Sequence, residues 1–134
     1  MAVFVDTGPW FAYFVRRDPD HEAAIEWMRR NRQSLVTTDY VIDELLTLLK
    51  IRDSYRLATA AGEALLQQNV ARVERITEAD FLVAWEAFRR YRDKGWSFTD
   101  CTSKAVMERL GITHAFAFDT DFEEFGTITR VPKS

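Results

Sequence analysis

Cysteine and histidine are scarce in this 134-residue chain, and their scarcity excludes several kinds of site. Cys101 is the only cysteine, so the sequence offers no internal disulfide framework and no cysteine-based zinc site. His21 and His114 are too few and too dispersed for a histidine-based metal centre or a general-base relay. This cysteine usage points to a protein of the reducing cytoplasm.

Long apolar runs and glycine-rich loops are also missing. No apolar run approaches the roughly 20 residues that cross a membrane, and no basic segment leads into a cleavable apolar stretch at the N-terminus. The five glycines form no phosphate-binding loop, and Ser97 and Ser103 lack the G-x-S-x-G context of a nucleophile. We therefore expect a cytoplasmic protein without membrane contact and without nucleotide-driven chemistry.

The residues that are present favour one globular domain. Apolar residues make up 47% of a 15.6 kDa chain, which is enough for a sizeable core. Strands are expected at residues 2–5, 35–37, 72–76, 114–118 and 128–131, and helices at 9–15, 21–32, 40–51, 53–68, 77–93 and 100–110. This alternation predicts an α/β domain over residues 1–134, with a mostly parallel central sheet of about five strands flanked by helices.

Acidic residues follow two of the predicted strands. Asp6 comes directly after segment 2–5, and Asp119 and Asp121 follow segment 114–118. Ligands of parallel sheets sit beyond the carboxyl ends of the strands, so we expect these carboxylates to share a site. Asp100 begins the helix that leads into the strand before Asp119, which places it near the same edge of the sheet.

Glu44 is the most informative acid, because it falls on the apolar side of its helix. At about 100° per residue, one broad arc holds the apolar residues Val41, Ile42, Leu45, Leu46, Leu48, Leu49 and Ile51. Glu44 lies inside this arc, near its edge. A carboxylate on an inward face is costly unless something compensates its charge, and a metal ion is the simplest compensation.

A cluster of carboxylates suits a hard divalent cation. Mg²⁺ or Mn²⁺ prefers oxygen ligands, keeps several waters and binds phosphate oxygens of a substrate. One such ion, or two about 4 Å apart, would promote attack of water on a phosphodiester. The net charge of -3 does not exclude this substrate, because setting five of the 21 acids aside leaves 16 against 18 lysines and arginines.

Each acid also has a purely structural interpretation. Asp100 fits the N-terminal cap of its helix. Asp6 fits a turn before the Gly-Pro pair that follows it, and Asp119 and Asp121 fit a turn that caps a short FEEF helix. Four independent structural roles are less economical than one shared site.

Four motifs occur in the order found in PIN-domain proteins: FVDT at 4–7, VIDELL at 41–46, SFTDCTSKAVMERLGI at 97–112 and AFAFDTDFEEFG at 115–126. The chain resembles this family over essentially its whole length, and is most similar to the single-domain VapC toxins of type II toxin–antitoxin systems. The acids of the family match Asp6, Glu44, Asp100 and Asp119, and Asp121 matches a further acid that many members carry. Thr99 matches a hydroxyl that often precedes the third acid, while Thr7 stands where other members have Ser or Asn.

This resemblance implies a Mg²⁺- or Mn²⁺-dependent endoribonuclease whose metal is held by these acids, with Thr7 and Thr99 in support. It also implies a homodimer and a small VapB-like antitoxin that wraps the toxin and blocks the site. An interpretation of another class is a PIN-like module that binds a protein or RNA without catalysis. The presence of all four acids favours the enzyme.

Clusters of basic and aromatic residues have two interpretations each. Two dense basic runs fit solvated helix faces better than RNA contacts. They are Arg89, Arg90, Arg92 and Lys94, and Arg29, Arg30 and Arg32. The aromatic group Trp10, Phe11, Tyr13 and Phe14 fits a core or an interface, and Phe81, Trp85 and Phe88 share one helix face. Trp96 fits core packing better than stacking on a base.

Overall fold

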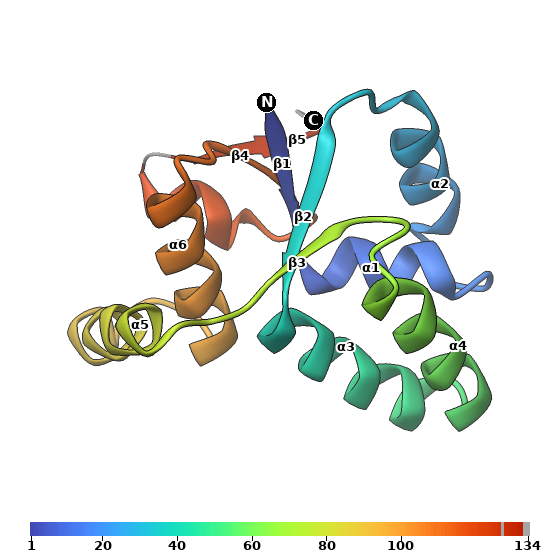
Figure 1. Ribbon diagram of the computed structural model, residues 1–134, viewed down its shortest axis with the longest axis horizontal. Helices are drawn as coiled ribbons and strands as arrows, with labels where there is room; N and C mark the ends of the chain where they lie inside the picture. The colour runs from blue at the N-terminus through green and yellow to red at the C-terminus, as the bar shows by residue number, and fades with distance from the viewer. Residues whose placement is uncertain (127, 133–134) are drawn as a thin grey trace.

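The computed structural model describes residues 1–126 and 128–132, and within them a parallel sheet is flanked by helices (Figure 1). The sheet has five strands in the order β3-β2-β1-β4-β5, and every neighbouring pair is parallel. The strands are β1 (Ala2–Val5), β2 (Ser34–Thr38), β3 (Arg72–Glu74), β4 (His114–Phe116) and β5 (Thr129–Val131). The predicted α/β architecture is therefore confirmed, while residues 127 and 133–134 of the predicted domain lie outside the described residues.

All six predicted helices are present. They are α1 (Thr7–Phe14), α2 (His21–Arg30), α3 (Asp39–Arg52), α4 (Tyr55–Leu66), α5 (Glu78–Arg90) and α6 (Phe98–Leu110), and a 3-10 helix, η1, spans Thr120–Phe125. In Figure 1, α5 and α6 lie on one side of the sheet and α1, α2 and α4 on the other, while α3 begins below β2. No helix in the described ranges is long and apolar enough to span a bilayer.

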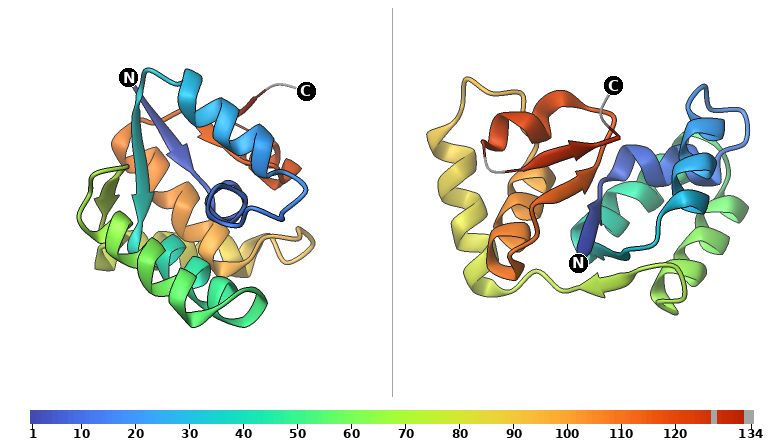
Figure 2. Two further views of the ribbon diagram at one scale, coloured as in Figure 1. Left: turned by 90° about the vertical axis from the view of Figure 1, so that its right-hand side faces the viewer. Right: turned by 90° about the horizontal axis from the view of Figure 1, so that it is seen from above.

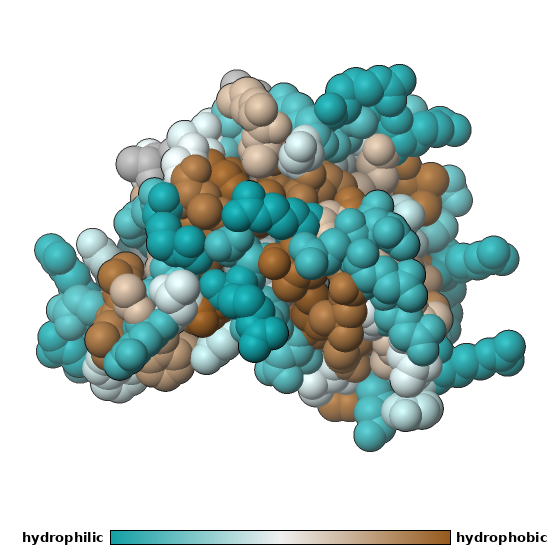
Figure 3. Space-filling model, in the orientation of Figure 1, coloured by the Kyte–Doolittle hydropathy of each residue, from teal (hydrophilic) through white to brown (hydrophobic). Residues whose placement is uncertain are grey.

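Helix α5 is the outermost element of its side, because α6 separates it from the strands (Figure 2). Its aromatic face, which we define as Phe81, Trp85 and Phe88, remains 41%, 49% and 42% exposed. The ring of Phe98 on α6 packs against Phe81 and Phe88 with centroids 5.1 and 5.7 Å apart. Apolar side chains consequently reach the surface at this end of the molecule (Figure 3).

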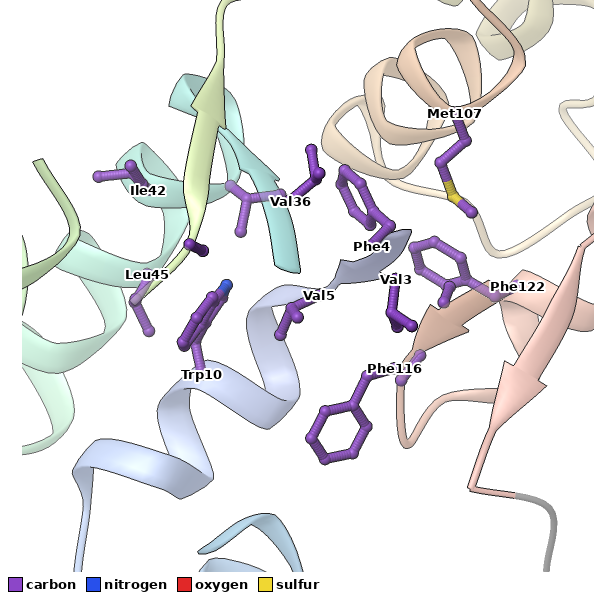
Figure 4. Packing of buried hydrophobic residues seen from close by; sticks show 14 of the residues in the cluster. Val3, Phe4, Val5, Trp10, Val36, Ile42, Leu45, Met107, Phe116 and Phe122 are labelled. Atoms are coloured by element: carbon purple, nitrogen blue, oxygen red, sulfur yellow. The ribbon is translucent and has the colours of Figure 1, made fainter. Parts of the chain in front are cut away.

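The core forms on both faces of the central strand β1. Phe4 is fully buried toward α6, where Met107 and Phe122 meet it (Figure 4). On the opposite face, Trp27 of α2 packs in a tilted arrangement against Phe116 of β4, with ring centroids 4.1 Å apart. This packing holds the ends of β1 and β4 in fixed positions, and the candidate site lies at those ends.

Several predicted boundaries differ from the structure. Helix α6 begins at Phe98 rather than at residue 100, because Ser97 is the N-cap, and α1 begins at Thr7 rather than at residue 9. The predicted helices 21–32, 53–68 and 77–93 are each shorter, as are the predicted strands 72–76 and 114–118. Ile51, predicted on the apolar face, is 75% exposed because it lies in the last turn of α3, beyond the core.

Candidate metal-binding site

A pocket of about 490 Å³ lies at the carboxyl ends of β1 and β4. All five acids predicted from the sequence line it: Asp6, Glu44, Asp100, Asp119 and Asp121. They come from four separate segments of the chain, which the parallel sheet and the start of α6 bring together. The pocket is therefore a product of the fold and not of one local motif.

Asp6 is held at the junction between β1 and α1. Its backbone N–H donates to the carbonyl of Phe116 at 3.0 Å, which ties the end of β1 to the end of β4. Although Asp6 is the N-cap of α1, its side chain accepts no capping hydrogen bond, so the carboxylate is left for the pocket. Burial, and then the carboxylates of Asp100, Glu44 and Asp119, raises the pKa of Asp6 to about 8.

Asp100 combines the two roles that the sequence left open. Ser97 caps α6 and accepts from the Asp100 N–H, while Oδ2 of Asp100 accepts from the Ser97 N–H, each at 3.0 Å. This capping box fixes the side chain without removing it from the pocket. Burial, with Glu44 and Asp121 nearby, raises the pKa of Asp100 to about 6.

The other three acids approach the pocket from α3 and η1. Glu44 is half-buried on α3, as its place near the edge of the apolar arc predicted. Asp119 was expected directly after a strand, but β4 ends at Phe116 and Asp119 instead caps η1, accepting from the Asp121 N–H at 2.9 Å. Burial and the carboxylates of Asp119 and Glu124 raise the pKa of Asp121.

The two threonines occupy different surroundings. Thr7 lines the pocket beside Asp6 and is only 5% exposed, yet its hydroxyl has no hydrogen-bond partner among the described residues. Thr99 is not among the residues that line the pocket, and its carbonyl accepts from the Thr102 hydroxyl at 2.6 Å. The structure thus brings Thr7, but not Thr99, to the wall of the pocket.

The chemistry of the pocket fits a divalent cation. Across residues 1–126 and 128–132, none of the five acids forms an ion pair with a lysine or arginine. Nor, in that part of the chain, do three carboxylate, histidine or cysteine side chains close around one point that could hold an ion. The acids surround an open pocket, which suits ions such as Mg²⁺ that retain several waters between themselves and the protein. A bound divalent ion would stabilise the negative charge of a buried carboxylate without a cationic partner, such as Asp6, more than that of an exposed one.

Further pocket residues were missed in the sequence. Asp18 and Asp20, from the loop between α1 and α2, line the pocket, and so does Arg52. No periodic pattern marked the two loop acids. Arg52 carried a usable signal, because it lies about two helical turns beyond Glu44 on α3.

The remaining clusters have structural roles. Trp96 is 8% exposed and packs against Tyr91 and Phe125, so the packing interpretation is confirmed. Trp10 is fully buried, which supports the core interpretation for that residue. In the two basic runs, Arg29 and Arg30 pair with Glu26, Arg89 with Glu86, and Lys94 with Glu124. No residue of either run lines the pocket described above.

Comparisons with known proteins agree with this fold and with the motifs. The family model for the PIN domain matches residues 3–128. The chain is 37% identical over 131 residues to the "23S rRNA-specific endonuclease VapC20" of Mycobacterium tuberculosis, covering 98% of this chain and 99% of that protein. It is 28% identical over 132 residues to a "VapC ribonuclease" of Archaeoglobus fulgidus, covering 91% of this chain and 80% of the relative.

Solved structures agree as well. The crystal structure of M. tuberculosis VapC20, described as a sarcin-ricin loop cleaving toxin, superposes with a TM-score of 0.89 at 36% identity, covering 94% of this chain and 96% of that one. VapBC2 of Rickettsia felis superposes with a TM-score of 0.70 at 9% identity over 97% of both chains, a likeness of fold alone. The chain therefore belongs to the PIN-domain family, and the predicted likeness to VapC proteins is confirmed.

Proposed function

We propose that the chain is a metal-dependent endoribonuclease, the VapC-type toxin of a toxin–antitoxin pair. The observation that carries this proposal is the pocket at the strand ends, where five carboxylates meet without a cationic partner among the described residues. The names of the relatives, an rRNA-specific endonuclease and a ribonuclease, support the same class of reaction. The rRNA specificity of VapC20 also makes the sarcin–ricin loop of 23S rRNA the first substrate to test.

The residues of this chain would have distinct roles in metal binding and in positioning the site. Asp6, Glu44, Asp100 and Asp119 would hold Mg²⁺ or Mn²⁺, with Asp121 beside them. The ion, when bound, supplies activation of water and neutralisation of charge on the phosphodiester. The capping box holds the Asp100 carboxylate in place, and the bond from the Asp6 N–H to the Phe116 carbonyl holds the start of α1.

The hydroxyl of Thr7 has a place in the same proposal. It is buried on the pocket wall and lacks a hydrogen-bond partner within the described ranges. Buried hydroxyls normally have a partner, and an ordered water often supplies it. We assign Thr7 the positioning of a water molecule beside Asp6, and we keep Thr99 as a residue that supports the first turn of α6 from outside the pocket.

Two protein partners belong to the proposal. A small VapB-like antitoxin would cover the pocket, as the resemblance to VapC toxins implies. A second copy of the chain would cover the aromatic face of α5, because exposed clusters of aromatic residues are typical of protein interfaces. The ring of Phe98 already orders this face in the single chain.

Cleavage of RNA by wild-type protein and by Asp100→Asn tests the enzyme. The amide can still accept the capping bond from Ser97, so we expect a folded variant whose cleavage of a sarcin–ricin loop RNA falls at least 100-fold, the scale of catalytic groups. Wild-type cleavage should require Mg²⁺ or Mn²⁺ and stop in EDTA. Asp93→Asn, at an exposed position outside the pocket, is the matched control and should cleave as wild type does.

Total cellular RNA is the second substrate. Discrete products from total RNA, but none from the loop, would support the endoribonuclease activity and show that its target is an RNA other than the sarcin–ricin loop. Intact RNA in every lane, with folded wild-type protein and added Mn²⁺, would contradict the endoribonuclease proposal. It would favour a PIN-like module that binds RNA or a partner protein without cutting.

A further inference from the structure

A second hollow is lined by residues next in sequence to residues of the carboxylate pocket, and arginines predominate among its charged side chains. It measures about 420 Å³ and its lining includes Arg16, Arg17 and Arg56, above the apolar side chains of Phe14 and Leu57. Asp53 also lines this second hollow, and the residue before it, Arg52, lines the carboxylate pocket. Arginine side chains therefore line both the carboxylate pocket and the second hollow.

A short clamp joins the two hollows. Nη1 of Arg17 donates to Oδ2 of Asp53 at 2.7 Å, and Nη2 donates to the carbonyl of Arg52 at 2.8 Å. These bonds fasten the segment between α1 and α2 to the segment between α3 and α4. Arg16 lies on the first segment, Arg52 is the last residue of α3, and Arg56 lies in the first turn of α4, so the three arginines flank this clamp. We call these three residues the arginine rim.

Within the described part of the chain, all three residues of the arginine rim lack partners, whereas each of the dense basic runs contains paired residues. In residues 1–126 and 128–132, the guanidinium groups of Arg16, Arg52 and Arg56 form no ion pair and no hydrogen bond, and all three residues are exposed. Lys94, next in sequence to the pocket residue Gly95, is paired with Glu124 at 3.3 Å. The unpaired positive charge next to the carboxylates is thus on the rim side.

We propose that the arginine rim binds the phosphates of an RNA strand on one side of the bond to be cleaved. The inference rests on the endoribonuclease function proposed above, since five carboxylates repel a polyanion and RNA needs adjacent cations to enter. Guanidinium groups bind phosphate oxygens with two parallel hydrogen bonds, which suits a rim of arginines. Arg17 holds the rim in shape, whereas Arg16, Arg52 and Arg56 contact the RNA.

The salt dependence of RNA binding tests the rim. The probe is a fluorescein-labelled single-stranded RNA, titrated over a range of KCl concentrations against Asp100→Asn protein, which binds without cutting. In this background we compare the triple variant Arg16→Gln, Arg52→Gln, Arg56→Gln with its parent. Three lost phosphate contacts reduce the magnitude of the negative slope of log K against log[salt] by about 2, which corresponds to about 100-fold weaker binding at 0.1 M salt.

The control is a triple variant with the same change in net charge. Arg29→Gln, Arg30→Gln, Arg32→Gln alters one of the dense basic runs, outside both hollows. It should keep the slope and affinity of the parent. Equal losses in both triple variants, or a loss in neither, would overturn the rim as an RNA site, as would a parent that binds no RNA. A rim variant that binds RNA normally but no longer binds the antitoxin would assign the rim to that protein instead.

Failure of the rim and failure of the enzyme are distinguishable. If wild-type protein with Mn²⁺ cuts RNA, and the rim substitutions change neither binding nor cleavage, the enzyme stands and the rim proposal fails. If wild-type protein binds RNA through the rim but cuts none, the rim proposal stands and the endoribonuclease fails. Melting temperatures of both triple variants within a few degrees of the parent would show that the fold is intact.

Discussion

The buried carboxylate of Asp6 reduces the stability of the metal-free chain when it is ionised. Asp6 is buried, its side chain accepts no capping bond from α1, and three neighbouring carboxylates repel its negative charge. Without a cation, the folded chain lowers this cost by keeping a proton on Asp6, whose pKa rises to about 8. A cation that displaces this proton gains the carboxylate as a ligand.

The stability of the metal-free protein should consequently fall as pH rises from 5 to 8. In this range the folded state retains the Asp6 proton, whereas the unfolded chain, with a pKa of 3.8, has released it. The folded state then binds more protons than the unfolded state, so its free energy of unfolding decreases with pH. Asp100, whose pKa rises to about 6, adds to the decrease in the lower half of the range.

Melting temperatures in EDTA at pH 5 and pH 8 measure this effect. The decrease should be smaller in Asp6→Asn, and Mg²⁺ should raise the melting temperature of the wild type more at pH 8 than at pH 5. A wild-type profile that is flat, or that matches the profile of Asp6→Asn, would contradict the buried, repelled carboxylate.

At the scale of elements, an ion pair with a buried carboxylate joins helices α5 and α6. Nε and Nη2 of Arg109 donate to Oδ1 and Oδ2 of Asp80, both at 2.9 Å, and Asp80 is 3% exposed. The same carboxylate completes the capping box of α5 by accepting from the Thr77 N–H at 3.0 Å. Arg109 also reaches Glu74 at 3.2 Å, which connects both helices to β3.

Arg109→Ala should therefore destabilise the protein by about 2–3 kcal/mol, because it leaves the buried Asp80 carboxylate without its cation. This value lies below the usual cost of breaking a fully buried pair, since the Arg109 side chain is 35% exposed. Arg109→Lys should lose less, keeping the charge without the two-pronged contact. Urea denaturation measures both variants, and Arg89→Ala, which breaks an exposed pair with Glu86, is the control with no measurable change expected. Equal stability of Arg109→Ala and the control would refute the role of the pair.

The secondary structure and the acidic site were predicted from the sequence more accurately than the ends of the elements and the arginine rim. The strands before Asp6 and Asp119 and the inward place of Glu44 could be predicted, because apolar runs and helical periodicity are local properties of the sequence. Strand and helix ends were less accurate, because they depend on caps such as Ser97 and on tertiary packing. The arginine rim as a whole could not be predicted, because only Arg52 has a helical spacing from Glu44, whereas Arg16 and Arg56 are brought beside it by a clamp between residues 17 and 53.

At the scale of the whole molecule, the aromatic face of α5 is the most prominent exposed apolar feature of one end. Leu82 and Val83 of the same helix are also 58% and 52% exposed, but they lie about 100° and 200° around α5 from Phe81 and so outside the aromatic face. Exposed apolar surface of this kind favours association, and α5 has no layer of the same chain outside it (Figure 2).

We expect Trp85→Glu to shift the proposed homodimer toward monomer, because it places a charge at the centre of the covering surface. Sedimentation equilibrium over a concentration series would show the dissociation constant rise by about tenfold or more, the loss that a central aromatic contact causes. Tyr55→Glu alters a tyrosine that is 67% exposed on α4 and serves as the control. A wild-type protein that stays monomeric at all concentrations would remove the dimer from the proposal.

The capping box of α6 has a genetic consequence. Asp100 is at once part of the helix cap and part of the carboxylate pocket, so under the proposed function a substitution at this one position changes both folding and toxicity. If the chain is a toxin, cells escape it most simply by mutation at such a position, yet replacements that cannot accept the Ser97 hydrogen bond also weaken the helix. Escape through asparagine would leave an intact, harmless protein that still occupies the antitoxin, and such an allele would interfere with the inhibition of any functional copy in the same cell.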